Sequence, residues 1–255
     1  MKAEKKSASS IAKRANEAHR SRILKKLIPA ILAVIAVLVV LVYIISVMYS
    51  RFGSFTVSVN KYHALQYGLS LSEDRFFSAP TSRLDCKAAE EITNIDGTTL
   101  NGLDLGAVDG NDSGENYLCY TFYCQNTGKE TLAFEYGIHI ANMTMDIEKA
   151  VRIRLITNYN GTLVSKTDYA RAAGVDEEGN AVAEPDTTAF FSKVTVMQAT
   201  QQEFHPGDVM KFTVVIWLEG NDPDCVDSII GGIMKLEMKF SVIASSDLEN
   251  QAAEP

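Results

Sequence analysis

The chain has 255 residues, of which 46% are hydrophobic and 22% are charged, and its net charge at pH 7 is −8. Binding to nucleic acid depends on clustered basic side chains that contact phosphates, so the acidic balance excludes nucleic acid as an expected partner. Length and composition leave room for a short N-terminal segment and one large domain.

The most informative feature is an uncharged, almost wholly apolar run over 27–50, LIPAILAVIAVLVVLVYIISVMYS. About 20 apolar residues in a helix are enough to cross the hydrocarbon core of a bilayer. A spanning segment must pair its own backbone groups, which favours a helix over an extended chain. The run therefore predicts a single transmembrane helix over 27–50, with the lipid bilayer as a partner.

Charge on the two sides of this run predicts its orientation. Residues 1–26 contain nine Lys or Arg and two Glu, or about +7, and because the whole chain is −8 the part after the run is about −15. Basic flanks stay on the cytoplasmic side of a membrane. We therefore expect a cytoplasmic tail over 1–26, which is either a helix lying on anionic lipid or a disordered topology signal, and an extracellular remainder.

A cleavable signal peptide is the alternative reading of the same run. Its apolar core would be about twice the usual length, and the exit sequence over 46–50, SVMYS, is a poor small-x-small cleavage site. These features favour an uncleaved anchor and a single-pass protein of the cell membrane.

The outer part reads as β-strands, because apolar residues alternate with polar ones along five segments. These segments are 118–124, 132–140, 151–155, 212–218 and 234–242. In this pattern Arg152 and Arg154 fall on a solvent-facing side. Turn residues separate the segments at 126–129, 160–161 and 206–208. The prediction is an all-β domain over 51–246, an antiparallel β-sandwich of jelly-roll or Greek-key type. It is followed by a disordered acidic tail over 247–255, and the stretches 72–116 and 157–188 are less regular.

A weak candidate for a calcium loop precedes the first of these segments. Asp109, Asn111, Ser113 and Glu115 alternate along DGNDSGE, with Gly114 at the sixth position. Oxygen ligands with a Gly at that position are typical of the first half of such a loop, but the bidentate Glu at position twelve is missing. A solvated acidic loop is the alternative, and calcium is the only cofactor that the sequence suggests.

A second acidic stretch lies at 219–227. Asp222 or Asp224 is placed to cap a short helix over 223–230, and Gly231 and Gly232 are placed to end it. Capping explains this composition without a metal.

Four cysteines lie in the outer part, at Cys86, Cys119, Cys124 and Cys225. An even number outside the cell permits two disulfides. Cys119 and Cys124 are five residues apart on one predicted strand and therefore on opposite faces, so they cannot pair with each other. They are candidates to pair with Cys86 and Cys225 in either order, and free thiols are the alternative.

Trp217, the only tryptophan, lies opposite the apolar side of its segment. It is either an exposed aromatic of a carbohydrate-binding face or a residue buried beneath a loop, which the neighbouring Val215 favours. No H-E-x-x-H and no G-x-S-x-G is present, and we expect no enzymatic activity.

Three blocks together resemble a known group. They are SFTVSVNKYHALQYGLSLSE (54–73), ENYLCYTFYCQNTGKETLAFEYGIHI (115–140) and FHPGDVMKFTVVIWLEGNDPDCVDSIIGGIMKLEMKF (204–240). They resemble surface proteins of Gram-positive bacteria, chiefly Clostridia, which are similar to the TasA/camelysin family of β-sandwich proteins associated with a dedicated signal peptidase.

The resemblance implies an extracellular jelly roll in a cell-surface or biofilm-matrix role, with matrix proteins or further copies of the chain as partners. Family members assemble into fibres by strand addition, and here the alternating strand Phe55, Val57 and Val59 is the candidate donor. The chain lacks the family's cleavable signal, and it has no zinc motif to support protease activity of the camelysin type. We therefore expect a membrane-anchored, non-catalytic surface protein, with a ligand- or glycan-binding adhesion module as the alternative and a metal-dependent hydrolase as the third reading.

Overall fold

A computed structural model describes residues 28–29, 31–43, 55–87 and 92–243. By its contacts the chain divides into two units, 1–52 and 53–255. In the first unit, residues 28–29 and 31–43 are helical and exposed. No helix within the described residues is both long enough and apolar enough to span a bilayer. The predicted helix over 27–50 extends past these residues at both ends, and the predicted tails over 1–26 and 247–255 lie outside the described residues.

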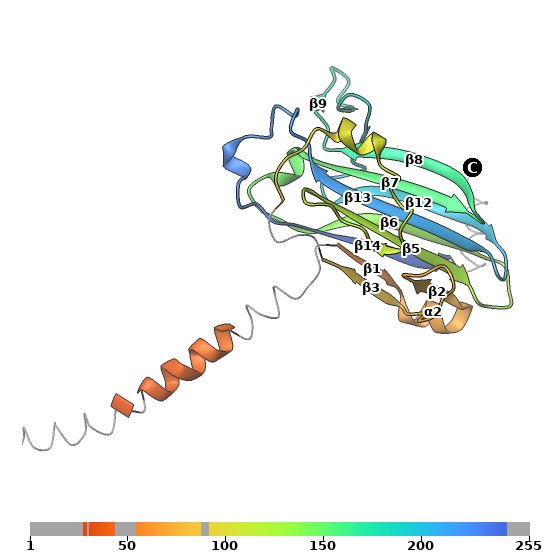
Figure 1. The fold of residues 1–255 in the computed structure, drawn as a ribbon, viewed down its shortest axis with the longest axis horizontal. Coiled ribbons are helices and arrows are strands. Elements are labelled where there is room, and N and C mark those ends of the chain that lie inside the picture. Colours follow the sequence, from red (N-terminus) through yellow and green to blue (C-terminus); the bar gives the residue numbers. More distant parts are fainter. Residues whose placement is uncertain (1–27, 30, 44–54, 88–91, 244–255) are drawn as a thin grey trace, which may run out of the picture. The chain divides into compact units, whose positions relative to one another are not determined.

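The second unit consists mainly of two β-sheets that lie face to face (Figure 1). The first sheet contains, in order, β12 (Thr195–Phe204), β6 (Leu132–Met143), β14 (Met234–Ile243), β1 (Phe55–Val59) and β3 (Arg83–Cys86). The second contains β11 (Thr188–Ala189), β8 (Thr162–Ala170), β7 (Val151–Tyr159), β13 (Val209–Leu218), β5 (Tyr117–Asn126) and β2 (Leu69–Ser72), and β4 (Gly110–Asn111) also pairs with β5. The β-rich prediction is confirmed.

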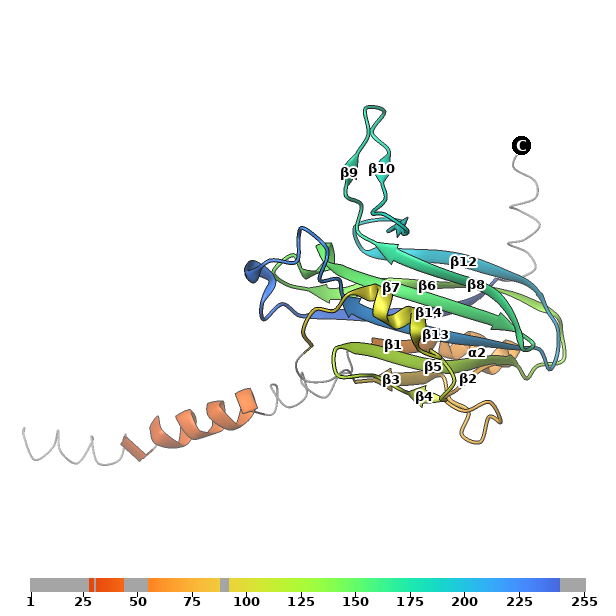
Figure 2. The ribbon, with the colours of Figure 1, turned by 45° about the horizontal axis from the view of Figure 1, so that its top comes forward.

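The prediction of a wholly antiparallel sandwich is wrong, because both sheets are mixed. β1 runs parallel to β14, and β11 runs parallel to β8. A parallel neighbour requires a long connection, and almost the whole domain separates β1 from β14. A separate hairpin of β9 (Gly174–Val175) and β10 (Ala181–Val182) projects away from the sheets (Figure 2). β8 lies within the stretch 157–188, which the sequence predicts to be less regular.

One apolar core lies between the sheets, and the predicted alternation places its side chains. Leu118, Tyr120, Phe122 and Cys124 of β5 are all at most 1% exposed. On the neighbouring strand of the same sheet, Phe212 of β13 stacks on Phe122, with ring centroids 5.3 Å apart. Aromatic pairs in such offset or edge-to-face arrangements contribute beyond the area that they bury.

The predicted turns are confirmed. Asn160 and Gly161 both have positive φ, 47° and 85°, and join β7 to β8 as a two-residue hairpin. A type I′ turn requires positive φ at both central residues, which Asn-Gly adopts most easily. The turns after Asn126 and Phe204 join β5 to β6 and β12 to β13.

The domain also contains α2 (Lys61–Tyr67), which the sequence does not predict, and three short 3-10 helices. They are η1 (Gly97–Gly102), η2 (Ile147–Lys149) and η3 (Asp227–Ile229). The Asn60 side chain caps α2 by accepting from the Tyr62 amide, and Gly68 ends it with a φ of 77°. Its seven residues are too few to show helical periodicity in the sequence.

The helix predicted over 223–230 is wrong in extent. η3 has three residues, begins after Val226 and has no side-chain cap. Asp222 and Asp224 do not cap it, because the Asp222 carboxylate is used elsewhere, as described below. Gly231 does end the segment, with a φ of 83°.

The strand expected to be a donor for another copy is paired within its own domain. β1 lies between β14 and β3, with Phe55 opposite both Leu236 and Cys86. Phe55, Val57 and Val59 are at most 4% exposed. Both edges of β1 are therefore used, and its apolar side chains belong to the chain's own core.

Replacing Phe212 by Ala should lower the free energy of unfolding by about 3–5 kcal/mol, since a buried aromatic is lost and a cavity remains. Phe191→Ala is the matched control, because that side chain is 73% exposed, and it should change stability by less than about 0.5 kcal/mol. Denaturant unfolding followed by the fluorescence of Trp217 measures both. Equal effects of the two substitutions would contradict the core placement of Phe212.

Candidate functional site

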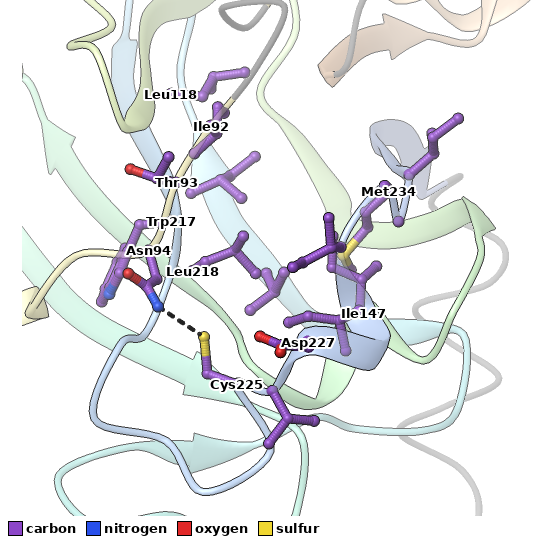
Figure 3. Close-up of a pocket in the computed structure, with 18 of the residues that line it drawn as sticks. Ile92, Thr93, Asn94, Leu118, Ile147, Trp217, Leu218, Cys225, Asp227 and Met234 are labelled. Carbon is purple, nitrogen blue, oxygen red and sulfur yellow. Dashed lines mark hydrogen bonds between the residues drawn. The ribbon is translucent and has the colours of Figure 1, made fainter.

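A cavity of about 780 Å³ lies at the end of the domain where β5, β7 and β14 begin and β13 ends (Figure 3). Most of its lining is aliphatic. The residues are Ile92, Thr93, Asn94, Leu118, Ile147, Val151, Ile216, Trp217, Leu218, Cys225, Val226, Asp227, Ile229, Ile230, Gly231, Gly232, Ile233, Met234 and Leu236. A concave, mainly apolar space of this size with a few polar groups is the usual form of a ligand site.

The mouth of the cavity is unusually apolar for a surface. Val226, Ile230 and Ile233 line it and are 51%, 72% and 48% exposed. Exposed aliphatic side chains gathered around an opening mark binding surfaces more often than isolated ones do. All three come from the segment between β13 and β14, where the sequence predicts a short capped helix over 223–230 that contains Val226 and Ile230.

Local backbone geometry fixes the position of this segment. A side chain at Gly232 would place its Cβ 2.9 Å from the Ile229 oxygen and 3.0 Å from the Ile147 Cβ. The backbone there packs directly against η2, which only glycine permits. The Ile233 amide donates to the Thr144 hydroxyl at 2.8 Å, which fixes the far side of the segment.

The polar groups of the cavity lie on one side. The Asn94 side-chain amide donates to the Cys225 sulfur at 3.3 Å, and Asp227 stands beside them among aliphatic side chains (Figure 3). Asp227 is exposed and forms no ion pair with any residue that the structure describes. This arrangement offers a carboxylate at the edge of an apolar space.

Trp217 closes one wall and belongs to a second, smaller core. It packs with Leu100, Cys119 and Val215 on the outer face of the second sheet and is 3% exposed. Its indole N–H donates to the Glu219 carboxylate at 3.0 Å, and the same oxygen accepts from the Gly97 amide. The prediction of burial beneath a loop is confirmed, and η1 is part of that loop.

The same outer face holds two buried arginines, although the alternation predicts that they face solvent. Arg152 is 5% exposed and binds Asp222 at 2.5 Å, with Glu184 3.9 Å away. Arg154 is 4% exposed and binds both oxygens of Asp168 at 2.6 and 2.8 Å. The alternation of apolar and polar residues shows on which face of the strand a side chain lies. Whether that face is exposed to solvent depends on the loop that covers it.

The Arg154 guanidinium also lies over the Trp217 ring, 5.4 Å from its centroid, and its Nη1 has no partner in the described chain. Because each arginine is neutralised by its own carboxylate, this cluster forms a buried structural network and offers no free charge for catalysis. The acidic stretch 219–227 was the one signal in the sequence for this network, because it contains Asp222, the partner of Arg152.

All four candidate disulfide cysteines are free thiols. Cys124 faces the main core and Cys119 the outer one, as their spacing predicted. Burial raises the pKa of Cys119 to about 11 and that of Cys86 to about 12. These thiols are therefore protonated at neutral pH, whereas Cys225 is half-buried at the cavity.

Three of the four candidate calcium ligands, all except Glu115, form hydrogen bonds with neighbouring protein groups. Asp109 accepts from the Tyr123 hydroxyl and from the Arg75 amide. Asn111 accepts from Ser113 in a local turn. Within the described residues, no three His, Cys, Asp or Glu side chains form a group suited to a metal ion.

The opposite end of the domain is closed by hydrogen bonds to Asp208. Its carboxylate accepts from the Tyr159 hydroxyl, from Asn160 Nδ2 at 2.8 Å and from the His205 amide at 2.7 Å. The hydrogen bond from Tyr159 is the main reason that the pKa of Asp208 is lowered, to about 2. Asp208 therefore ties β7 to the turn between β12 and β13.

No family model matches the chain, and no curated protein matches it in sequence. A crystal structure of a β-glucosidase from Kluyveromyces marxianus in complex with glucose is 10% identical with a TM-score of 0.27, and covers 72% of this chain and 17% of its own. A selenomethionine-labelled structure of a β-glucosidase from the same organism is 12% identical with a TM-score of 0.26, and the shares are 71% and 18%. The chain thus spans less than a fifth of either enzyme, and the likeness is too low to indicate a function.

Replacing Arg152 by Met should destabilise the domain by about 3–5 kcal/mol, because Asp222 would be left buried without its partner. The double variant Arg152→Met/Asp222→Leu should be more stable than the single one, since both charges are then gone. Arg83→Met is the control. Its bond to Asp85 is exposed, so it should cost less than about 1 kcal/mol. Denaturant titrations of the three variants test this, and a double variant no better than Arg152→Met would contradict it.

Asp208 should make stability depend on pH in acid. Its folded pKa lies below the usual value of 3.8, so its stabilisation is complete above that value and is lost as the pH falls toward about 2. Asp208→Asn should therefore flatten the dependence of unfolding free energy on pH in this window, and Tyr159→Phe should flatten it less. Unfolding titrations at several acid pH values measure the slopes, and an unchanged slope in Asp208→Asn would refute this role.

Proposed function

We propose that this chain is a membrane-anchored protein whose non-catalytic β-sandwich lies outside the cell and acts in cell-surface or biofilm-matrix structure. The observation that carries the proposal is the uncharged run over 27–50 between a tail of about +7 and a remainder of about −15. Such an asymmetry orients a spanning helix with its basic side in the cytoplasm.

The linker supports a short tether. Only residues 51–54 separate the run from β1, a reach of at most about 14 Å in an extended chain. β1 in turn lies inside its sheet, between β14 and β3. A pull on the anchor would therefore act on a strand that is paired on both sides, which suits a domain that stays attached.

Sequence resemblance to TasA/camelysin-like surface proteins of Gram-positive bacteria supports the same location and a jelly-roll topology. Donation of β1 to another copy is not part of the proposal, because β1 is buried in its own sheet. Strand addition by matrix proteins or further copies would instead use a border strand. The borders are β12 and β3 in one sheet and β11 and β2 in the other.

The chemistry of the described side chains supports a role without catalysis. The buried arginines are bound by Asp222 and Asp168, and burial keeps Cys86 and Cys119 protonated at neutral pH. A catalytic group has to be within reach of its substrate, and these four side chains, two arginines and two cysteines, are buried.

A second candidate function is ligand binding, which the cavity favours. Glycans are a poor match for this site. Sugar-binding faces usually present an exposed aromatic, whereas Trp217 is 3% exposed and hydrogen-bonded to Glu219. An apolar ligand fits the aliphatic lining better.

Protease added to intact cells should remove the outer domain and leave the tail, because residues 51–255 are expected outside. Antibodies against an N-terminal and a C-terminal tag follow the two ends, and a cytoplasmic protein serves as the control for lysis. In lysed cells both tags should be lost. Loss of only the N-terminal tag from intact cells would reverse the topology, and release of an intact domain without protease would indicate a cleaved signal.

A further inference from the structure

We propose that the cavity at the end of the sandwich binds an amphiphile with a long alkyl chain and a cationic head group. The alkyl chain would lie in the aliphatic interior, and the head group would lie beside Asp227. This inference rests on the second function proposed above, ligand binding at the cavity, and does not depend on the membrane anchor.

The depth of the cavity suits an alkyl chain. Leu118 and Leu236, which line it, are both 1% exposed and belong to the main core. Ile216 and Leu218, which pack against this core and are partly buried, also line the cavity. A chain that entered here would extend the existing core and remove apolar surface from water, which is the main favourable term in such binding.

The mouth suits the part of the chain nearest the head group. Val226, Ile230 and Ile233 expose about half or more of their surface around the opening. In the free protein these side chains face water, so covering them favours binding. A ligand with only a short apolar part would leave them uncovered.

Charge at the mouth selects a cation. Asp227 is the ionisable carboxylate in the lining. The nearby basic side chains have other partners, since Lys149 binds Asp146 and Arg152 binds Asp222. The part of the chain after the run is about −15, which attracts cations and repels anions at longer range.

Cys225 provides a reporter inside the site. It is half-buried and lines the cavity, whereas Cys86, Cys119 and Cys124 are at most 2% exposed. A neutral maleimide should therefore label Cys225 alone in the folded protein. A ligand in the cavity should slow this labelling, and labelling of the other three cysteines would reveal unfolding.

The experiment uses the full chain in nanodiscs of zwitterionic lipid, with labelling by N-ethylmaleimide followed by mass spectrometry. Dodecyltrimethylammonium and dodecyl sulfate are compared as probes, because their alkyl chains match and their charges are opposite. Both are used at concentrations that leave the three buried cysteines unlabelled. The cationic probe should slow labelling of Cys225 by about tenfold at ten times its dissociation constant, and the anionic probe should have little effect.

Two variants and one control separate the parts of the site. Ile233→Trp adds bulk at the mouth and should abolish protection by the cation, while the backbone bonds of this residue to Thr144 can remain. Asp227→Asn should weaken binding of the cation about twofold to fivefold, as expected for a partly exposed ion pair. Asp224→Asn is the matched control, since that exposed carboxylate is in the same loop but does not line the cavity.

Protection by the cation that depends on Ile233 and Asp227 but not on Asp224 would establish the site. Equal protection by both probes would refute the charge preference, and no protection by either would refute the site. Equal protection in Ile233→Trp and the wild type would place the probe elsewhere. Failure of the chain to enter nanodiscs would count against the anchor, and the labelling of protein kept in a neutral detergent would still decide the proposal.

Discussion

Contact between Phe212 and Phe240 joins the two sheets, and much of the structure follows from it. The ring centroids are 5.3 Å apart and the rings are nearly perpendicular. The Phe122 ring contacts both, at 5.3 Å from Phe212 and 6.1 Å from Phe240. Phe212 is in the middle of β13, so the alternation of a strand directs Val214 to the same core and Val215 and Trp217 to the other face. Because those two residues are also apolar, the outer face of this sheet has to be covered.

That cover brings segments distant in sequence together and explains the buried charges. η1 and the stretch after β13 lie over Val215 and Trp217, and Glu219 binds both the Trp217 indole and the Gly97 amide. The same cover removes Arg152 and Arg154 from water. Since a buried charge without a partner is costly, each guanidinium needs a carboxylate, and Asp222 and Asp168 supply them. The acidic loop is thus part of the domain's stability.

The sequence predicted what depends on local periodicity and missed what depends on distant contacts. Alternation identified β5, β6, β7, β13 and β14, and Asn160-Gly161 identified a hairpin, because both signals lie within a few residues. The same alternation failed for Arg152 and Arg154, whose burial depends on a cover from elsewhere in the chain. The pairing of β1 also depends on distant segments. Nothing within FTVSV shows that β14 and β3 pair with it, so the sequence alone allowed β1 to be interpreted as a strand donated to another copy. The cavity combines residues from 92 to 236, and no single motif could have revealed it.

The space between the two sheets ends differently at the two ends of the domain. At one end Asp208 binds Tyr159, Asn160 and the His205 amide, so polar groups close the space between the sheets. At the other end the strands supply aliphatic side chains, and Gly232 lets the covering segment pack closely against Ile147 of η2. An apolar core that opens to water at one end loses free energy that a larger side chain could recover. Leaving it open is costly for folding alone, and this cost is the physical reason to regard the open end as a binding site.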